Sequence, residues 1–280
     1  ISLSVNGAFQ EIAPGGAVTN DEMSLSYVLK PTGVEPLTSI GSMPLNGTQT
    51  MVANYNPKLI AITDDGDQVA FTTAEGVFEL SSQSLRVEII KLSSLIDVVA
   101  LEYDKSGSLW AFPSDASLPV EVYDRTTVVR TLDSPFSGLR LAAAIAPEGT
   151  RVVQSIQTED AESFLDVGVV LRDANSIPLA LNNGLRVQPV LGTPIAVSWQ
   201  EPASIRVLET TASGLTAFSE YSISGPRTQL PMPPNIGIEL HTAASSASSY
   251  MLSEAGEVWL FSANSWRRIA TGVTSISQLR

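Results

Sequence analysis

Three stretches of the chain share one pattern, and they decide the fold: LIAITDDGDQVAF at 59–71, VALEYDKSGSLWAF at 99–112 and LAAAIAPEGTRVV at 141–153. Each stretch contains an apolar strand, a turn of acidic or small residues, and a second apolar strand. The turns carry Gly66, Gly107 and Gly149, which are 41 and 42 residues apart. A period of roughly 40–50 residues predicts a β-propeller, in which each repeat forms one blade.

Each repeat continues with two more short strands. In the first repeat they are VFEL at 77–80 and RVEII at 86–90. A degenerate copy of the pattern, PIAVSWQEPASIRVL, occupies 194–208, and a fifth unit covers 237–270. Turn-forming residues separate the strands, and no segment shows a sustained apolar stripe with the period of a helix. We therefore predict an all-β protein built of four-stranded blades.

The number of blades depends on the two ends of the chain. Residues 24–31 and 34–38 resemble the outer strands of a further unit, and 272–277 resemble an innermost strand. A blade assembled from both termini would close the ring and leave only short strand edges exposed. We expect six blades in one β-propeller domain over residues 1–280. Five blades are the alternative, with residues 1–20 belonging to a preceding domain.

Composition limits the function. The chain has 280 residues, of which 44% are hydrophobic, and its net charge is −13. This charge disfavours binding to nucleic acid and to anionic lipid headgroups, because like charges repel. The absence of cysteine excludes disulfides and thiolate chemistry. No run has the length of a membrane span, and since the chain starts at Ile1 we expect a mature form or a fragment.

The residues that could support catalysis do not form a convincing set. His241 is the only histidine, and no Gly-x-Ser-x-Gly motif accompanies it, so a packed or channel-lining histidine is favoured. Glycosidases need two converging carboxylates, but carboxylates in turns more often support the turn by local hydrogen bonds. The turn carboxylates are Asp64, Asp65, Asp104 and Glu148. We predict a protein that is not an enzyme and has no cofactor and no metal.

Two segments are candidates for partner binding. The insertion TEDAESFLD at 158–166 holds Glu159, Asp160, Glu162 and Asp166. Its spacing does not match a calcium-binding loop, so we expect a solvated loop that could contact a partner. The second candidate is Trp266 with Arg267 and Arg268, because tryptophan and arginine are enriched in binding hot spots. Trp110, Trp199 and Trp259 occupy apolar strand positions and are expected to pack between blades.

Six segments occur in a fixed order along nearly the whole chain: ISLSVNG at 1–7, SYVLKPTGVEPL at 26–37, AITDDGDQVAF at 61–71, GSLWAF at 107–112, PIAVSWQEPASIRVLE at 194–209 and GEVWLFSANSWRRIATG at 256–272. These segments, taken in this order, resemble the C-terminal part of the actinobacterial lipoprotein LpqB family. The resemblance implies a propeller that is preceded in the full-length protein by a lipidated cysteine and a GerMN-like domain, whose tail would be residues 1–20. It also implies an extracytoplasmic accessory protein of the sensor kinase MtrB.

We therefore expect a monomeric, non-enzymatic domain that binds the extracytoplasmic domain of a membrane sensor kinase and modulates it. Long loops on rigid blades, chiefly 156–166 and 183–193, would form the contact surface and would favour a basic partner. The membrane would be reached only through a lipid anchor that this chain lacks. Two alternatives remain: a propeller that binds or cleaves cell-wall glycans, and a structural lipoprotein of the cell envelope.

Overall fold

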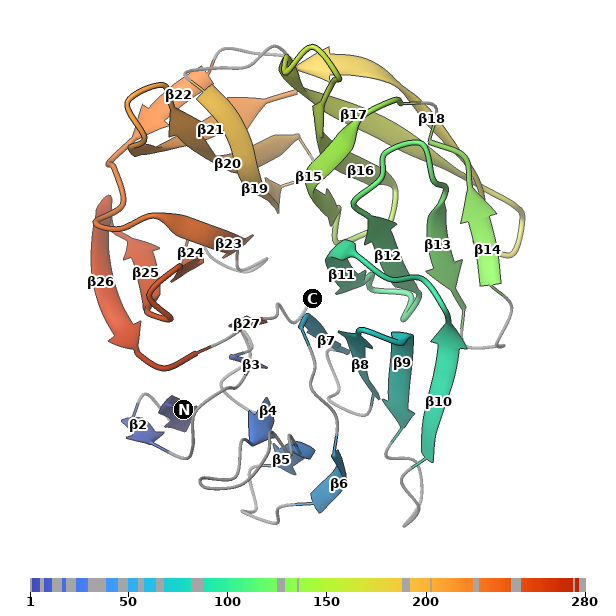
Figure 1. Cartoon of the computed structure of the whole chain (residues 1–280), viewed down its shortest axis with the longest axis vertical. Coiled ribbons are helices and arrows are strands. Elements are labelled where there is room, and N and C mark those ends of the chain that lie inside the picture. Colours follow the sequence, from blue (N-terminus) through green and yellow to red (C-terminus); the bar gives the residue numbers. More distant parts are fainter. Residues whose placement is uncertain are drawn as a thin grey trace.

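The computed structural model consists of β-strands arranged around a central axis (Figure 1). It describes residues 58–63, 68–81, 88–124, 129–134, 136–187, 192–201, 203–223, 227–242, 248–273 and 275–276, and before residue 58 the backbone of six strands. No helix occurs in these parts of the chain. The predicted all-β propeller with four-stranded blades is confirmed.

Five sheets have four antiparallel strands each, in sequential order from the central axis outwards. Blade 1 contains β7 (Ile60–Ile62), β8 (Gln68–Thr73), β9 (Gly76–Ser81) and β10 (Glu88–Ser93). Blade 2 contains β11 (Val98–Tyr103), β12 (Leu109–Pro113), β13 (Val120–Tyr123) and β14 (Val129–Leu132). Blade 3 contains β15 (Leu139–Ile145), β16 (Arg151–Gln157), β17 (Ser163–Arg172) and β18 (Pro178–Val187).

Blade 4 contains β19 (Gly192–Glu201), β20 (Ser204–Thr211), β21 (Thr216–Ser222) and β22 (Arg227–Leu230). Blade 5 contains β23 (Gly237–Thr242), β24 (Ser249–Ser253), β25 (Val258–Ser262) and β26 (Ser265–Ala270). The first strands of neighbouring blades contact one another, so β7, β11, β15, β19 and β23 surround the axis. The repeat read from the turn glycines therefore corresponds to one blade.

The favoured count of six blades is wrong, because the described residues form five four-stranded sheets. The two ends of the chain do meet between blade 5 and blade 1 (Figure 1), where β27 (Ser275–Ile276) pairs in parallel with β3 (Ala17–Val18). The neighbouring strands β4 (Ser24–Leu29), β5 (Ser39–Pro44) and β6 (Thr50–Asn54) form a separate three-stranded sheet, and β1 (Ser2–Val5) pairs with β2 (Ala8–Glu11). Residues 34–38, expected as a strand, lie outside the described residues.

The prediction of long loops at 156–166 and 183–193 is also wrong for the residues that the structure describes. Strands β17 and β18 have ten residues each, and most of the residues between 156 and 187 belong to them. What connects β16 to β17 is a five-residue turn, 158–162, closed by a hydrogen bond from the Thr158 amide to the Glu162 carbonyl of 2.8 Å. Residues 188–191, in the second expected loop, lie outside the described residues.

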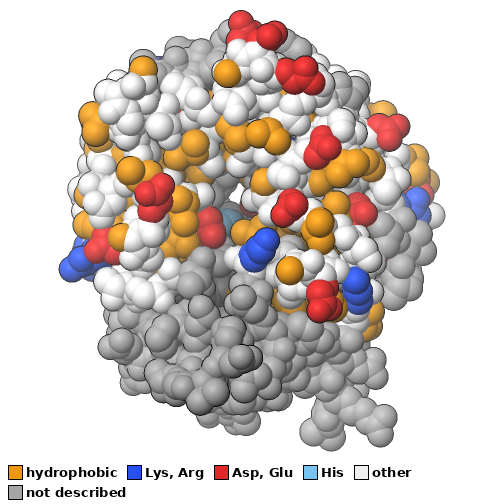
Figure 2. Space-filling model, viewed as in Figure 1, with side chains coloured by type: hydrophobic (Ala, Val, Ile, Leu, Met, Phe, Trp, Pro, Cys, Tyr) orange, Lys and Arg blue, Asp and Glu red, His pale blue; other side chains and the backbone are white. Residues whose placement is uncertain are grey.

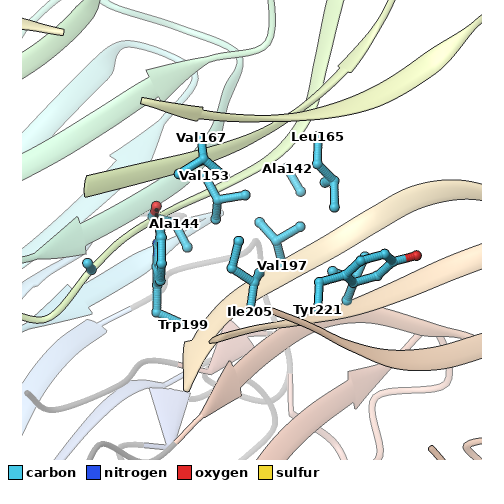
Figure 3. Close-up of a cluster of buried hydrophobic side chains, with 11 residues drawn as sticks. Ala142, Ala144, Val153, Leu165, Val167, Val197, Trp199, Ile205 and Tyr221 are labelled. Carbon is cyan, nitrogen blue, oxygen red and sulfur yellow. Dashed lines mark hydrogen bonds between the residues drawn. The ribbon is translucent and has the colours of Figure 1, made fainter. Parts of the chain in front are cut away.

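Apolar side chains pack between neighbouring blades. Between blades 3 and 4, side chains of β15, β16 and β17 point toward those of β19, β20 and β21 (Figure 3). Trp199 is fully buried there, and its indole nitrogen donates to the Ala144 carbonyl at 3.0 Å. Burial of such a large side chain stabilises the fold by about 1.5–3 kcal/mol. Trp110 is equally buried between blades 2 and 3, so both tryptophans pack as predicted.

Polar side chains also join neighbouring blades. Glu102 of blade 2 accepts a hydrogen bond from the Ile145 amide of blade 3 at 2.9 Å. Arg206 of blade 4 donates to the Ser249 hydroxyl of blade 5 at 2.8 Å. Because these bonds connect strands that are far apart in sequence, they orient the blades as well as stabilising them, and the loops at both ends of the ring are held in fixed positions.

Candidate interaction surface

A narrow channel follows the propeller axis. Its lining comes from the innermost strand of each blade and from Ile276 of β27. Blades 2 to 5 each have a β-bulge at the same point of this strand, where Val99, Leu141, Ile195 and Ile238 project toward the channel. The cavity that remains is about 70 Å³. Pockets for small organic ligands usually measure roughly 300–1,000 Å³, so the channel has room for a few water molecules but not for a sugar.

The channel holds two carboxylates and the single histidine. Glu102 and Glu239 bind the backbone amides of Ile145 and Ile276 on the next strand around the axis, at 2.9 and 2.8 Å. His241 lines the channel on β23, as the sequence predicted. Because both carboxylates hold the neighbouring strands, they have a structural role. Within the described residues, no group of three or more histidine, aspartate or glutamate side chains is placed to hold a metal ion.

The turn carboxylates are structural as well. Asp104 is 4% exposed and accepts hydrogen bonds from the Ser106 and Ser108 amides at 2.9 and 3.1 Å, and from Trp110 Nε1 at 3.0 Å. Glu148 is exposed and pairs with Lys105 at 3.4 Å. Gly107 has a positive φ of 78°, which explains why glycine is needed in the turn. Asp64 and Asp65 lie outside the described residues.

The two ends of the ring differ in which loops they carry. One end, called the upper face below, has the turns between the second and third strands and the connections from one blade to the next. Hydrogen bonds join these two kinds of loop: Ala116 donates to the Gly138 carbonyl at 3.0 Å, and Glu254 donates to the Ile236 carbonyl at 3.0 Å. The opposite face has the turns between first and second and between third and fourth strands, and includes Asp104 and Glu148.

Exposed apolar side chains gather on the upper face. Seven of the twelve exposed large hydrophobic residues in the described part of the chain lie in its loops or at its strand starts: Ile96, Leu118, Leu139, Leu215, Met232, Ile236 and Ile238. The other five lie on outer strands, where Leu171 and Leu179 are next to the strand ends at the opposite face, and none lies in a described loop of that face. In Figure 2, apolar side chains lie along the described part of the rim of the central opening, and acidic side chains lie among and outside them. Such a concentration on one face is typical of an interaction site.

The upper face is also acidic. Its loops expose the carboxylates of Glu75, Asp97, Asp115, Asp133, Glu159, Asp160, Glu162 and Glu254. Lys58 is the one basic residue in the loops of this face that the structure describes. In the described turns of the opposite face, two ion pairs join Lys105 to Glu148 at 3.4 Å and Arg172 to Asp104 at 2.9 Å. In the loops that the structure describes, the upper face therefore carries an excess of negative charge.

The predicted acidic residues separate into two groups. Glu159, Asp160 and Glu162 are exposed in the turn 158–162 on the upper face. Asp166 is 0% exposed within β17, where its Oδ1 accepts a hydrogen bond from the Gly184 amide at 3.2 Å. Asp166 therefore holds β17 to β18 and does not reach a partner's surface. The turn is much shorter than the loop that the sequence suggested.

The predicted tryptophan and arginine pair lies on another blade. Trp266 of β26 packs against Phe218 and Phe261, with ring centroids 5.1 Å apart, and its indole nitrogen donates to the Pro231 carbonyl at 3.0 Å. Arg267 and Arg268 are exposed on this outermost strand, and Arg268 pairs with Glu257 at 2.5 Å. These residues are on blade 5 and the acidic turn is on blade 3 (Figure 1), so the structure does not join them into one site.

Two grooves of the upper face flank the acidic turn. The groove between blades 2 and 3 has a volume of about 630 Å³ and is bordered by 114–117, 137–139 and 157–161. The groove between blades 3 and 4 has about 400 Å³ and includes Gly192, Thr193 and 210–212. Sequence analysis missed both, because their walls come from loops of different blades. An apolar residue next to a turn in the sequence, such as Leu118, could have indicated them.

Solved structures share this fold. The β-propeller domain of Cps50 (Swd1) from Myceliophteria thermophila matches with a TM-score of 0.59 and 11% identity, over 92% of this chain and 97% of that chain. The tricorn protease matches with a TM-score of 0.62 and 10% identity, over 96% of this chain and 32% of that chain. A nidogen–laminin complex matches with a TM-score of 0.54 and 13% identity, over 80% and 85%. At these identities the likeness shows the fold alone, and the chain is a β-propeller.

The family is shown by sequence. The model of the lipoprotein LpqB β-propeller domain matches residues 36–276, and the chain therefore belongs to this family. This confirms the resemblance found in the sequence and indicates an extracytoplasmic lipoprotein. A search of curated proteins finds none that matches the chain. In the described parts of the chain, no helix is long and apolar enough to cross a membrane.

Proposed function

We propose that this propeller is a non-enzymatic interaction domain that binds the extracytoplasmic domain of a two-component sensor kinase and modulates its signalling. The full-length protein would be held at the membrane by a lipid anchor. The observation that carries the proposal is the upper face, where exposed apolar and acidic side chains occur together on a rigid scaffold. Membership of the LpqB propeller family supports it.

The physical argument for binding is preorganisation. The loops of the upper face are held by hydrogen bonds between blades, so little conformational entropy is lost when a partner docks. The apolar side chains supply burial, and the carboxylates guide a basic partner toward the face. A sensor domain that fits would present lysine or arginine side chains around an apolar centre.

The geometry gives less support to the two alternatives. A glycan-cleaving propeller needs converging carboxylates in a space that admits a sugar, whereas Glu102 and Glu239 bind backbone amides in a channel of about 70 Å³. A purely structural envelope protein would need no concentration of apolar and acidic groups on one face. For these reasons we place recognition of a protein partner first.

Biolayer interferometry of this chain against the purified extracytoplasmic domain of the sensor kinase tests the proposal. We expect saturable binding that weakens with salt, since exposed charges are screened at high ionic strength. Absence of binding by protein that is shown to be folded would contradict the proposal for this domain. Signalling output in a deletion strain then separates a modulator from a structural lipoprotein, and a glycan array tests the carbohydrate alternative.

A further inference from the structure

We propose that the groove between blades 2 and 3 on the upper face is the primary contact site, and that it binds an extended protein segment in which a lysine or arginine stands next to a large apolar side chain. This inference rests on the proposed function, and it names the place and the chemistry of recognition. The acidic turn, one of the candidates from the sequence, is one wall of this groove.

The groove has the size and shape to hold side chains of a peptide. One wall is the loop 114–117 of blade 2, the other is the turn 157–161 of blade 3, and 137–139 forms the floor. Its volume of about 630 Å³ lies within the range of roughly 300–1,000 Å³ that is usual for binding pockets. The central channel, at about 70 Å³, is too small for this purpose.

Hydrogen bonds between the two blades fix the floor and one wall. Asp115 and Leu139 form an antiparallel β-bridge, and the Arg140 amide donates to the Ser114 carbonyl at 2.6 Å. Beneath them the Arg140 guanidinium is 1% exposed and donates to the carbonyls of Pro113 and Asp115, to the Ser134 hydroxyl and to Gln154 Oε1. The groove is therefore formed before any partner arrives, which favours binding.

The lining determines which segment fits. Leu139 is 52% exposed in the floor, and Leu118, at 43%, lies next to the wall, so both offer apolar contact area. Asp115 and Glu159 place a carboxylate on each wall, and no lysine or arginine lines the groove. Hydrogen bonds from Ser117 hold the pKa of Asp115 below its usual value, so this carboxylate is charged at neutral pH. An acidic segment would be repelled, and a polar segment would leave Leu139 uncovered.

The experiment uses the whole chain and three short labelled peptides of equal length, composed of lysine and leucine, glutamate and leucine, or lysine and serine. Fluorescence anisotropy should show binding of the lysine–leucine peptide and much weaker binding of the other two. Leu139→Ser and Glu159→Lys should each weaken that binding by about tenfold or more, as expected for central contacts. Thermal unfolding checks that both variants remain folded.

Matched controls lie away from the groove. Leu179 on β18 is 54% exposed, so Leu179→Ser removes a leucine of equal exposure from another surface. Glu148→Lys reverses a charge on the opposite face. Both should leave peptide binding within about twofold of the original chain. Equal binding of the lysine–leucine and glutamate–leucine peptides would overturn the inference, and so would an unchanged affinity in Leu139→Ser and Glu159→Lys.

The same variants separate this inference from the proposed function. If the sensor domain binds the original chain and the two groove variants equally well, the groove is not the contact site, although the proposed function stands. If the original chain binds the lysine–leucine peptide in the groove but not the sensor domain, the groove stands and the proposed partner is wrong. Displacement of the sensor domain by the peptide would support both.

Discussion

The guanidinium of Arg172 on blade 3 lies 2.9 Å from Oδ2 of Asp104 on blade 2, and both side chains are largely buried. The same guanidinium donates to the Gly149 carbonyl at 2.7 Å. A Cβ atom at Gly149 would come within 2.2 Å of this arginine and 2.5 Å of the aspartate. Arg172 therefore joins the turn of blade 2, through Asp104, to the equivalent turn of its own blade, through Gly149.

Removal of Asp104 should destabilise the propeller strongly. Asp104→Ala removes the acceptor of the Trp110 indole nitrogen and leaves Arg172 without its carboxylate partner, with only backbone carbonyls as acceptors. Loss of one partner of a buried ion pair costs about 3–5 kcal/mol. Urea unfolding should show this loss, whereas Glu148→Ala, which breaks an exposed pair, should cost less than about 1 kcal/mol. If Asp104→Ala and Glu148→Ala lowered the free energy of unfolding equally, the buried ion pair would contribute no more to stability than the exposed one.

The hydrogen bond of Trp199 should contribute measurably to stability. Trp199→Phe keeps an aromatic ring but removes the donor to the Ala144 carbonyl, which connects blades 4 and 3. We expect a loss of about 1–3 kcal/mol in the free energy of unfolding, because a buried hydrogen bond and part of a fully buried side chain are lost. Trp259→Phe is the matched control, since Trp259 is only partly buried and its donor reaches Glu257 at the surface. The prediction fails if Trp259→Phe lowers the free energy of unfolding by as much as Trp199→Phe does.

Arg140 should not be replaceable by lysine. Its guanidinium reaches four acceptors in different directions, and an ammonium group cannot match this geometry. Arg140→Lys should therefore cost about 1–3 kcal/mol, since at least one buried acceptor loses its partner. It should also loosen the loop 114–117 beside the groove, and hydrogen exchange of the Ala116 amide would report this. An unchanged exchange rate would show that Arg140 does not hold the loop.

The acid titration of Asp115 tests the structure of the same loop. Hydrogen bonds from the Ser117 hydroxyl and amide lower the pKa of Asp115 below its ordinary value of 3.8. A lowered pKa in the folded state means that these bonds stabilise the protein above pH 3.8, and the stabilisation is lost as the pH falls through the folded-state pKa. Carbon-detected NMR should find the midpoint below 3.8, and Ser117→Ala should raise it. A midpoint that does not respond to Ser117→Ala would contradict the assigned cause.

The candidate residues show how far sequence analysis reached. The exposed acidic turn with Glu159, Asp160 and Glu162 could be predicted because an acidic turn between strands is a local feature. Asp166 is only four residues further on, yet it is buried, since β17 starts at Ser163 and turns its side chain inward. Trp266 has the composition of a hot spot, but contacts with Phe218 and Pro231 make it part of the packing between blades.

The sequence by itself determined that the protein is an all-β propeller of the LpqB family with four strands in each blade. Apolar strands and turn glycines can be recognised locally in the sequence, and their constant spacing reveals the repeat that forms one blade. Only the tertiary structure decided how the ends of the chain meet, that β27 pairs with β3, and that seven exposed apolar residues share one acidic face. The residues of that face come from loops of different blades, so they become neighbours only when the blades are arranged around one axis.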